Sequence, residues 1–258
     1  MIPETTGTLI EELKLTTVLN LSKTVLVVTF FSRSEVTAMV ESLPPPIFIA
    51  DATGLDFLNS RAVPIDSEID WIGSGEDLIN WMLAAELVPP EVVAALRKTA
   101  VPEEFDTVAS KARKLREWFR GFVRSHLGSP LKPKALQELE PLNRVLIRDE
   151  QFGQVTAREI SRKGNTKQDR QEEAPLSGLV WSPRRRWRSP DALLFPIAKA
   201  MADLICDEDF TYVRACEGHD CVLLFVDRTR GHGRRWCSMS VCGNRAKQAA
   251  HRERAARA

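Results

Sequence analysis

The sequence predicts an α+β protein, in which a mixed, largely helical N-terminal α/β domain precedes a small C-terminal zinc-binding module. Three observations support this prediction. Apolar residues recur at helical spacing through the middle of the chain, short β-branched runs precede them, and four of five cysteines fall between Cys216 and Cys242. With 258 residues and 43% apolar content, the chain is large enough for a buried core and an appendage.

Residues 1–46 are predicted to be an N-terminal extension. Residues 9–21 have an amphipathic pattern, and residues 24–31 are rich in β-branched side chains, which predicts a strand. The triple proline at 44–46 marks a boundary because proline lacks an N–H donor and favours extended backbone.

No segment resembles a membrane span or a secretory leader. The longest apolar run, residues 25–31, is far shorter than the roughly 20 residues that cross a bilayer. Residues 1–10 contain an acid and no basic residue before the first apolar run. We therefore expect a cytoplasmic protein with no membrane partner.

Residues 47–206 are predicted to form the mixed domain. The apolar segments around Thr53 and Gly54 predict a hairpin over residues 47–58. Apolar stripes, which indicate ordinary packing surfaces, predict helices over residues 75–87, 90–99, 103–127, 133–148 and 190–206. Cys206 continues the last stripe and is interpreted as a small buried hydrophobic residue, not a ligand.

Residues 161–188 are polar and charged, with several glycines and prolines, which predicts an exposed connection or hairpin. Arg184, Arg185, Arg186 and Arg188 cluster there. A solvated basic loop is the favoured interpretation of this cluster, and a phosphate contact is the alternative.

Charge is distributed unevenly, although the formal net charge is only +1. Residues 211–258 contain ten basic and four acidic residues, a balance of +6, whereas the 26 basic and 31 acidic residues before them give −5. A locally basic module predicts an anionic partner, and nucleic acid is the first candidate.

The four C-terminal cysteines form two C-x4-C pairs separated by fifteen residues. In a reducing compartment such a cluster indicates metal binding in place of disulfides. Four thiolates select zinc and close its tetrahedral coordination, so we predict one structural Zn²⁺ held by Cys216, Cys221, Cys237 and Cys242. Iron in a rubredoxin-like site and unrelated buried thiols are the alternatives, and His219 and His232 are interpreted as solvated bystanders.

The predicted module, residues 207–258, follows the element order of a treble-clef finger. Residues 222–226 predict a strand, 230–233 a turn, 234–236 the return strand, and 243–257 a helix. Zinc is expected to supply on the order of 10 kcal/mol of folding free energy to so small a module, which should unfold locally without metal.

Two strings in this module, RRWCSM at 234–239 and CGNRAK at 242–247, resemble the CGNR zinc-finger family, named for four of these residues. Residues 214–227 are similar to that family's first knuckle and strand. Upstream, LDFLNS at 55–60 resembles the ABATE domain that precedes the finger in such proteins. The resemblance covers about residues 47–258 and implies a mixed α/β domain, a treble-clef finger and a bacterial transcription regulator linked to stress.

Basic and polar residues of the hairpin and the last helix are the candidate nucleic-acid contacts: Arg228, Arg230, Arg234, Arg235, Asn244, Arg245, Lys247, Gln248, Arg252 and Arg254. Interspersed alanines keep the helix slim enough for a major groove roughly 12 Å wide. A basic terminus that is merely solvated is the simpler alternative. Few stacking aromatics favour DNA, with RNA left open. Because one small finger binds weakly, a homodimer through the N-terminal domain is expected.

An enzyme in the N-terminal domain is the competing interpretation. The acidic residues that crowd one region are Asp51, Asp56, Asp66, Glu68, Asp70, Glu76 and Asp77. They could include an acid/base pair or a hard-metal site, although helix caps and solvated faces are commoner roles. Because no nucleotide-binding, hydrolase or zinc-protease motif is found, we expect no enzyme. A small-molecule effector is a third possibility, and the sequence identifies no ligand.

Overall fold

This computed structural model describes residues 16–20, 23–27, 43–63, 68–157 and 178–257. The chain divides into two compact units between Pro44 and Pro45, inside the triple proline. In the first unit, strand β1 (Thr16–Asn20) pairs antiparallel with strand β2 (Lys23–Val27). Of the predicted amphipathic stretch and strand, residues 9–15, 21 and 28–31 lie outside the described ranges.

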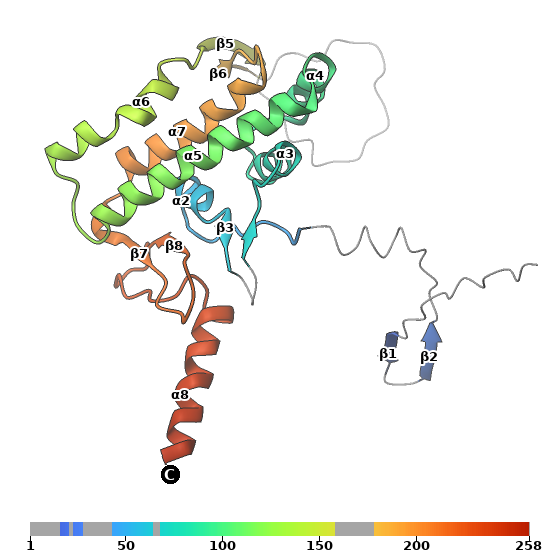
Figure 1. The fold of residues 1–258 in the computed structure, drawn as a ribbon, viewed down its shortest axis with the longest axis vertical. Helices are drawn as coiled ribbons and strands as arrows, with labels where there is room; N and C mark the ends of the chain where they lie inside the picture. Colours follow the sequence, from blue (N-terminus) through green and yellow to red (C-terminus); the bar gives the residue numbers. More distant parts are fainter. Residues whose placement is uncertain (1–15, 21–22, 28–42, 64–67, 158–177, 258) are drawn as a thin grey trace, which may run out of the picture. The chain divides into compact units, whose positions relative to one another are not determined.

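The second unit is a helical layer with small antiparallel sheets at its edges (Figure 1). Its helices are α2 (Thr53–Leu58), α3 (Gly75–Ala84), α4 (Pro90–Thr99), α5 (Pro102–His126), α6 (Glu140–Leu146), α7 (Leu194–Asp207) and α8 (Asn244–Arg257). Its strand pairs are β3 (Arg61–Ala62) with β4 (Ile69–Asp70), β5 (Gln151–Ala157) with β6 (Leu179–Arg185), and β7 (Val213–Ala215) with β8 (Leu224–Val226). This mixed, largely helical architecture confirms the predicted fold class.

Helices α5 and α7 form the centre of the core. The predicted stripe of α5 is buried, including Phe105, Phe119 and Phe122, and α2, α3 and α7 pack against this helix. Proline opens both α4 and α5, where its missing N–H costs nothing. Ser74 caps α3 in a reciprocal capping box with Asp77. No helix among the described residues is both long and apolar enough to cross a membrane.

The predicted hairpin over residues 47–58 is wrong, because Thr53–Leu58 forms helix α2. Gly54 is not a turn residue. A Cβ at this position would lie 2.6 Å from the Ala200 carbonyl oxygen of α7, so the glycine allows α2 and α7 to approach each other closely.

Two further expectations need correction. The helix predicted over residues 133–148 is a 3₁₀ segment, η1 (Pro133–Glu138), followed by the short helix α6, because Pro141 restarts the chain in a first helical turn. Cys206 is exposed, not buried. It lies five residues after the buried Met201, which places it off the apolar face of α7.

The region predicted as an exposed connection or hairpin, residues 161–188, contains strand β6, which pairs with the preceding strand β5, and residues 158–177 lie outside the described part. At its base Arg185 forms two hydrogen bonds with Asp149, at 2.6 and 2.8 Å, and Arg188 forms two with Glu150 at the same distances. Arg186 lies 3.7 Å from Glu150. Three of the four clustered arginines thus have acidic partners in the protein.

Within the cysteine module, the predicted return strand at residues 234–236 is wrong. Strand β8 pairs with β7, which precedes the first cysteine, and Val213 lies opposite Val226. Residues 227–237 form an irregular loop instead. The treble-clef assignment therefore stays a prediction, whereas the C-terminal helix is confirmed as α8.

Candidate zinc site

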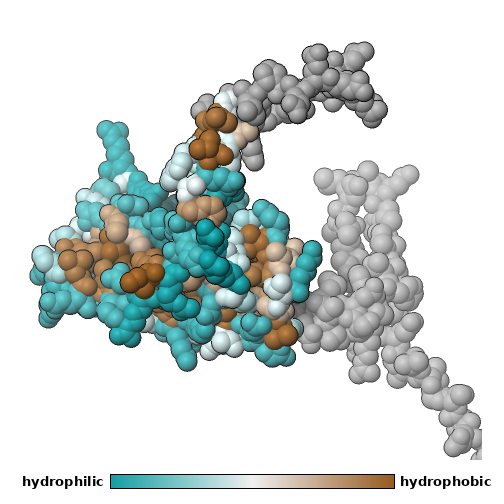
Figure 2. All heavy atoms as spheres, turned by 90° about the horizontal axis from the view of Figure 1, so that it is seen from above, coloured by the Kyte–Doolittle hydropathy of each residue, from teal (hydrophilic) through white to brown (hydrophobic). Residues whose placement is uncertain are grey.

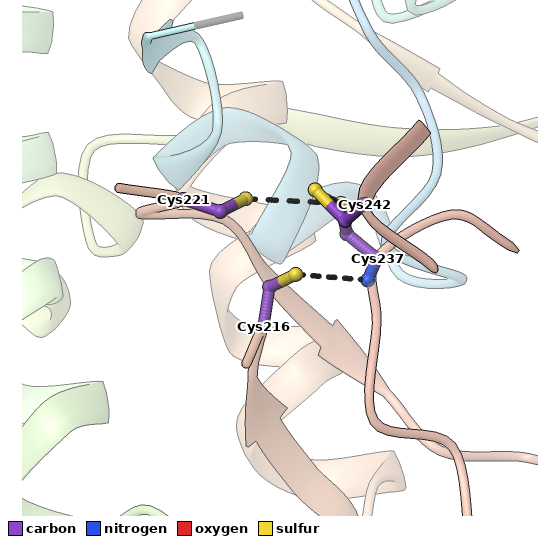
Figure 3. Close-up of side chains that lie close together, drawn as sticks. All are labelled: Cys216, Cys221, Cys237 and Cys242. Atoms are coloured by element: carbon purple, nitrogen blue, oxygen red, sulfur yellow. Dashed lines mark hydrogen bonds between the residues drawn. The ribbon is translucent and has the colours of Figure 1, made fainter. Parts of the chain in front are cut away.

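Four cysteine side chains converge on one point of the second unit (Figure 3). The sulfur atoms of Cys216, Cys221, Cys237 and Cys242 lie within 4.8 Å of one another. Cys221 Sγ lies 3.8 Å from Cys237 Sγ, which lies 3.6 Å from Cys242 Sγ. A tetrahedral zinc ion with sulfur ligands at about 2.3 Å requires sulfur–sulfur distances of about 3.8 Å. The four predicted ligands therefore fit a zinc ion.

The first cysteine pair lies in a tight knuckle after β7. The backbone N–H groups of Gly218 and Cys237 donate hydrogen bonds to Cys216 Sγ at 3.3 and 3.2 Å, which orient this sulfur within the cluster. A Cβ at Gly218 would lie only 2.9 Å from Cys242 Sγ. Glycine is therefore needed where the knuckle passes over the sulfur cluster.

Neighbouring cysteines shift the pKa values of Cys221, Cys237 and Cys242. A hydrogen bond from Cys237 lowers the pKa of Cys221 to about 5. The pKa of Cys237 is raised by this hydrogen bond and by burial, and burial raises the pKa of Cys242 to about 11. Four thiolates this close repel one another unless a cation neutralises them, and a divalent metal ion supplies that charge.

The second cysteine pair lies at the start of the last helix. Cys242 belongs to a π-helical turn, η4 (Met239–Gly243), and α8 follows from Asn244. The two histidines are outside the cluster: His219 is exposed beside Asp220, and His232 stacks on Tyr212 with ring centroids 3.6 Å apart. The sulfur cluster thus adjoins the turn from which α8 begins.

Arg234 joins the site to the N-terminal part of the second unit. Its guanidinium donates to the carbonyl oxygens of Ile49 at 2.9 Å and Cys237 at 2.6 Å, and it forms an ion pair with Asp51. It also lies over the Phe225 ring, 4.1 Å from the centroid. The guanidinium is therefore engaged by groups of the protein itself, and it connects the cysteine loop to the segment around Ile49. We refer to this arrangement as the Arg234 clamp.

Hydrogen bonds to the buried side chain of Asp227 hold the loop over residues 227–237, where a return strand was predicted. Asp227 accepts hydrogen bonds from the backbone N–H of Arg234 at 2.8 Å and from Thr229 at 3.0 Å. Its own N–H donates to the Tyr212 carbonyl. The string that resembled the finger family included Asp227, but its spacing did not indicate this role.

The LDFLNS string contacts the cysteine module directly. Asp56 Oδ1 accepts the N–H groups of Ile49 and Ala50, both at 3.1 Å. Asn59 forms two buried hydrogen bonds with the backbone of Leu224 in β8. Sequence reasoning considered Asp56 only as an acid of a possible catalytic or metal site, and it missed Asn59 because its partner lies 165 residues later in the chain.

The other candidate contact residues lie on two surfaces. On the loop, Arg228 pairs with Glu208, Arg235 pairs with Glu217, and Arg230 is exposed without an ion pair among the described residues. On α8, the exposed candidates are Asn244, Arg245, Lys247, Gln248, Arg252 and Arg254. Helix α8 extends away from β7 and β8 (Figure 1), and none of residues 244–256 is buried.

The crowded acids do not form a common site in the described part of the chain. Asp51 pairs with Arg234, Glu68 with Arg61, and Asp70 with the buried Arg116. Glu76 pairs with Arg97, and Asp77 caps α3. Asp66 lies outside the described residues.

Two family models match the chain. The ABATE model, described as "Putative stress-induced transcription regulator", matches residues 51–208, and the CGNR zinc-finger model matches residues 212–255. Both resemblances noted in the sequence are thus confirmed. No curated protein matches the chain. The matched segments meet between residues 208 and 212, and the cysteine cluster lies entirely in the second.

Proposed function

We propose, given that this chain belongs to the ABATE family and carries a CGNR zinc finger, that it is a zinc-dependent DNA-binding transcription regulator of bacterial type. The observation that supports this most is the four-sulfur cluster at the start of a basic helix with no buried residue over 244–256. The proposal places the protein in the cytoplasm, where thiols stay reduced and available to metal.

One structural zinc ion is proposed per chain. Four sulfur ligands fill the tetrahedral coordination and leave no position for a substrate. The metal's role is then to hold the Gly218 knuckle against the turn that begins α8. A treble-clef arrangement is part of this proposal, with a side-chain-supported loop in the place of a regular hairpin.

The proposed DNA contacts are exposed residues of α8 and of the loop. Residues 244–257 carry five basic side chains and one acid, and the helix has no apolar face that would pack on a protein. In helical projection Arg245, Gln248 and Arg252 share one face, and Lys247 and Arg254 share the next. A major groove admits such a helix, with arginine and glutamine at base edges and the other cations at phosphates.

Duplex DNA is favoured over RNA by the module's aromatic residues. Phe225 is buried, Tyr212 is stacked on His232, and Trp236 is partly covered by Arg235. Few aromatic faces remain for unstacked bases, which single-stranded RNA readers require.

A second copy of the chain is the proposed partner of the β5–β6 hairpin. In the register of the hairpin, Val155 lies opposite Trp181 and Ala157 opposite Leu179, so these side chains share one face. Val155, Leu179 and Trp181 are 62%, 61% and 66% exposed. Figure 2 shows hydrophobic side chains gathered on this projecting segment. A two-stranded hairpin is marginal alone, and a two-fold dimer would bury the same apolar face on both copies.

Fluorescence anisotropy with mixed-sequence duplex DNA tests the proposed function. The zinc-loaded protein should bind at low salt, and a Cys237→Ser, Cys242→Ser variant should lose zinc and binding together. Arg254→Gln should lower the affinity and reduce the slope of log K against log salt by about 0.9, because Arg254 is a proposed phosphate contact. Arg144→Gln, on exposed α6, is the matched control and should bind unchanged.

Absence of binding at low salt would contradict the proposal, as would unchanged affinity in the cysteine variant. Tighter binding to single-stranded or duplex RNA of equal length would select the RNA alternative. Nothing in the arrangement of the described acids favours catalysis, so no enzymatic role is proposed.

Sedimentation over a range of protein concentrations tests the dimer. Trp181→Ser should shift the protein towards monomer, because it removes the largest exposed side chain of the hairpin face. Leu136→Ser, an equally exposed apolar residue of η1, should leave the association unchanged. A protein that is monomeric at every concentration contradicts the proposed dimer.

A further inference from the structure

A cavity of about 810 Å³ lies between the zinc module and the N-terminal part of the second unit. Its walls come from the segment before α2, the end of β3, the Gly218 knuckle, η4 and the first turn of α8. Cavities of this size at such boundaries are typical of small-molecule sites. Three of the cysteines labelled in Figure 3, Cys221, Cys237 and Cys242, form part of its wall, so the cavity adjoins the sulfur cluster.

The lining of the cavity is mainly aliphatic. It includes Ile47, Ile49, Val63, Val222 and Val241, all of which are partly or fully exposed. Exposed aliphatic groups gathered around one hollow are favourable contacts for an apolar ligand, since each buried CH₂ group gains about 0.8 kcal/mol. The wall thus selects a ligand with an apolar body.

Among the described residues of the lining, the arginine is Arg245, in the first turn of α8. The imidazole of His219 and the carboxylate of Asp220 also line the cavity, and they are exposed and contact each other. A guanidinium recognises a carboxylate through paired hydrogen bonds, and the N-terminal end of a helix also favours an anion. The cysteine sulfurs would repel an anion beside them, so the charged end of a ligand belongs at Arg245.

We propose that this cavity binds an amphipathic carboxylate, with its apolar body between Ile47, Val222 and Val241 and its carboxylate at Arg245. The site would make the protein responsive to a small molecule. This effector role rests on the proposed function, because Arg245 is also a proposed DNA contact. A bound carboxylate competes with DNA for this side chain, and the two ligands then lower each other's affinity by the same factor.

Calorimetric titration of the DNA-free, zinc-loaded full chain tests the site directly. The probes are decanoate, decanol and decyltrimethylammonium, which share an alkyl chain and differ in charge. Decanoate should bind most tightly. Arg245→Gln should weaken decanoate binding about tenfold or more and abolish the preference over decanol, because it removes a charge-assisted contact. Arg252→Gln, seven residues further on the same helix face, should change it less than about twofold.

A second pair of variants tests the apolar wall. Val241→Asp places a carboxylate in the lining and should abolish decanoate binding, whereas Met239→Asp, in the same turn but outside the lining of this cavity, should not. Zinc content is measured for every variant, so that loss of the metal site is recognised. If the Val241→Asp protein contains no zinc, Val222→Asp, another residue of the lining, is used in its place.

The proposal is overturned if no probe binds at millimolar concentration, if decanol or the ammonium probe binds as tightly as decanoate, or if Arg245→Gln binds decanoate like the wild type. These titrations contain no DNA. If decanoate binds but DNA does not, the proposed DNA-binding function is refuted and the proposed carboxylate site stands. If DNA binds but decanoate does not, only the carboxylate site is refuted.

Discussion

Asn59 forms a closed pair of buried hydrogen bonds with the backbone of Leu224, 165 residues later in the chain. The Asn59 side-chain N–H donates to the Leu224 carbonyl at 2.8 Å, and the Leu224 N–H donates to Asn59 Oδ1 at 2.9 Å. The amide thus satisfies the free edge of β8 as a neighbouring strand would. This relationship makes the finger's strand part of the N-terminal core.

Asn59→Asp should destabilise the protein by about 2–4 kcal/mol. The carboxylate keeps the shape of the amide, but it cannot donate to Leu224 and would bury an uncompensated charge. Chemical denaturation of the zinc-loaded protein measures the effect. Asn143→Asp, at an exposed position of α6, is the control, and an equal loss in both variants would contradict the assigned role.

Gly218→Ala should lower zinc affinity about tenfold or more, because the new Cβ would lie 2.9 Å from Cys242 Sγ and must displace a ligand. Competition against a chromophoric chelator provides the measurement. Gly231→Ala, where nothing lies within 4 Å of the added carbon, should bind zinc like the wild type. Equal affinities in the two variants would show that the knuckle tolerates a side chain.

Arg234→Lys should cost about 2–4 kcal/mol of stability and loosen zinc binding, although it preserves the charge. Lysine cannot reproduce the forked contacts to Ile49, Cys237 and Asp51. The adjacent, exposed Arg235→Lys is the control and should change stability by less than about 0.5 kcal/mol. Thermal unfolding and zinc release are measured together, and similar curves for both variants would refute the clamp.

Stability should fall as pH rises from about 4 to about 6 through the titration of Asp56. Burial raises the pKa of this carboxyl to about 6, despite hydrogen bonds from the backbone of Ala50 and Ile49. The folded state then holds the proton more tightly than the unfolded state, so the stabilisation is present at low pH and is lost as pH approaches 6.

Asp56→Asn should remove this pH dependence, because an amide oxygen can still accept both backbone N–H groups without ionising. The difference in unfolding free energy between variant and wild type is measured from pH 4 to pH 8, which cancels the pH dependence of zinc binding. The variant should gain relative stability above pH 6, up to about 3 kcal/mol. A difference that is constant with pH would contradict the raised pKa.

Most of the long helices and the clustering of the four cysteines could be predicted because their signals are local. Apolar spacing set α5 to within one residue at either end, and the repeated C-x4-C pattern identified the cluster. Gly54 led to the wrong prediction of a turn. The sequence does not distinguish a turn glycine from one that allows two helices to approach closely, because the contacting residue, Ala200, is distant in sequence. The fold class could be predicted from the helical spacing of apolar residues, whereas the packing of α2 on α7 depends on a tertiary contact that this spacing does not indicate.

The supports of the zinc site could not be predicted for the same reason. Asp51, Asn59 and Arg234 act across more than 160 residues, so no spacing rule connects them. The return strand was expected because a turn at residues 230–233 would bring the next residues back beside the strand at 222–226. Here Asp227 holds the loop through side-chain hydrogen bonds, and β8 pairs with the earlier strand β7.

The buried strand β8 limits where this chain can be divided into separately folding fragments. The family matches meet between residues 208 and 212, which suggests a place to cut the gene into two expressible fragments. A fragment ending there would leave Asn59 and Ala50 without Leu224 and Val226. We therefore expect that the zinc-finger segment does not fold when it is expressed alone or moved to another protein. Chimaeras that exchange it between relatives should also include the residues around Ala50 and Asn59.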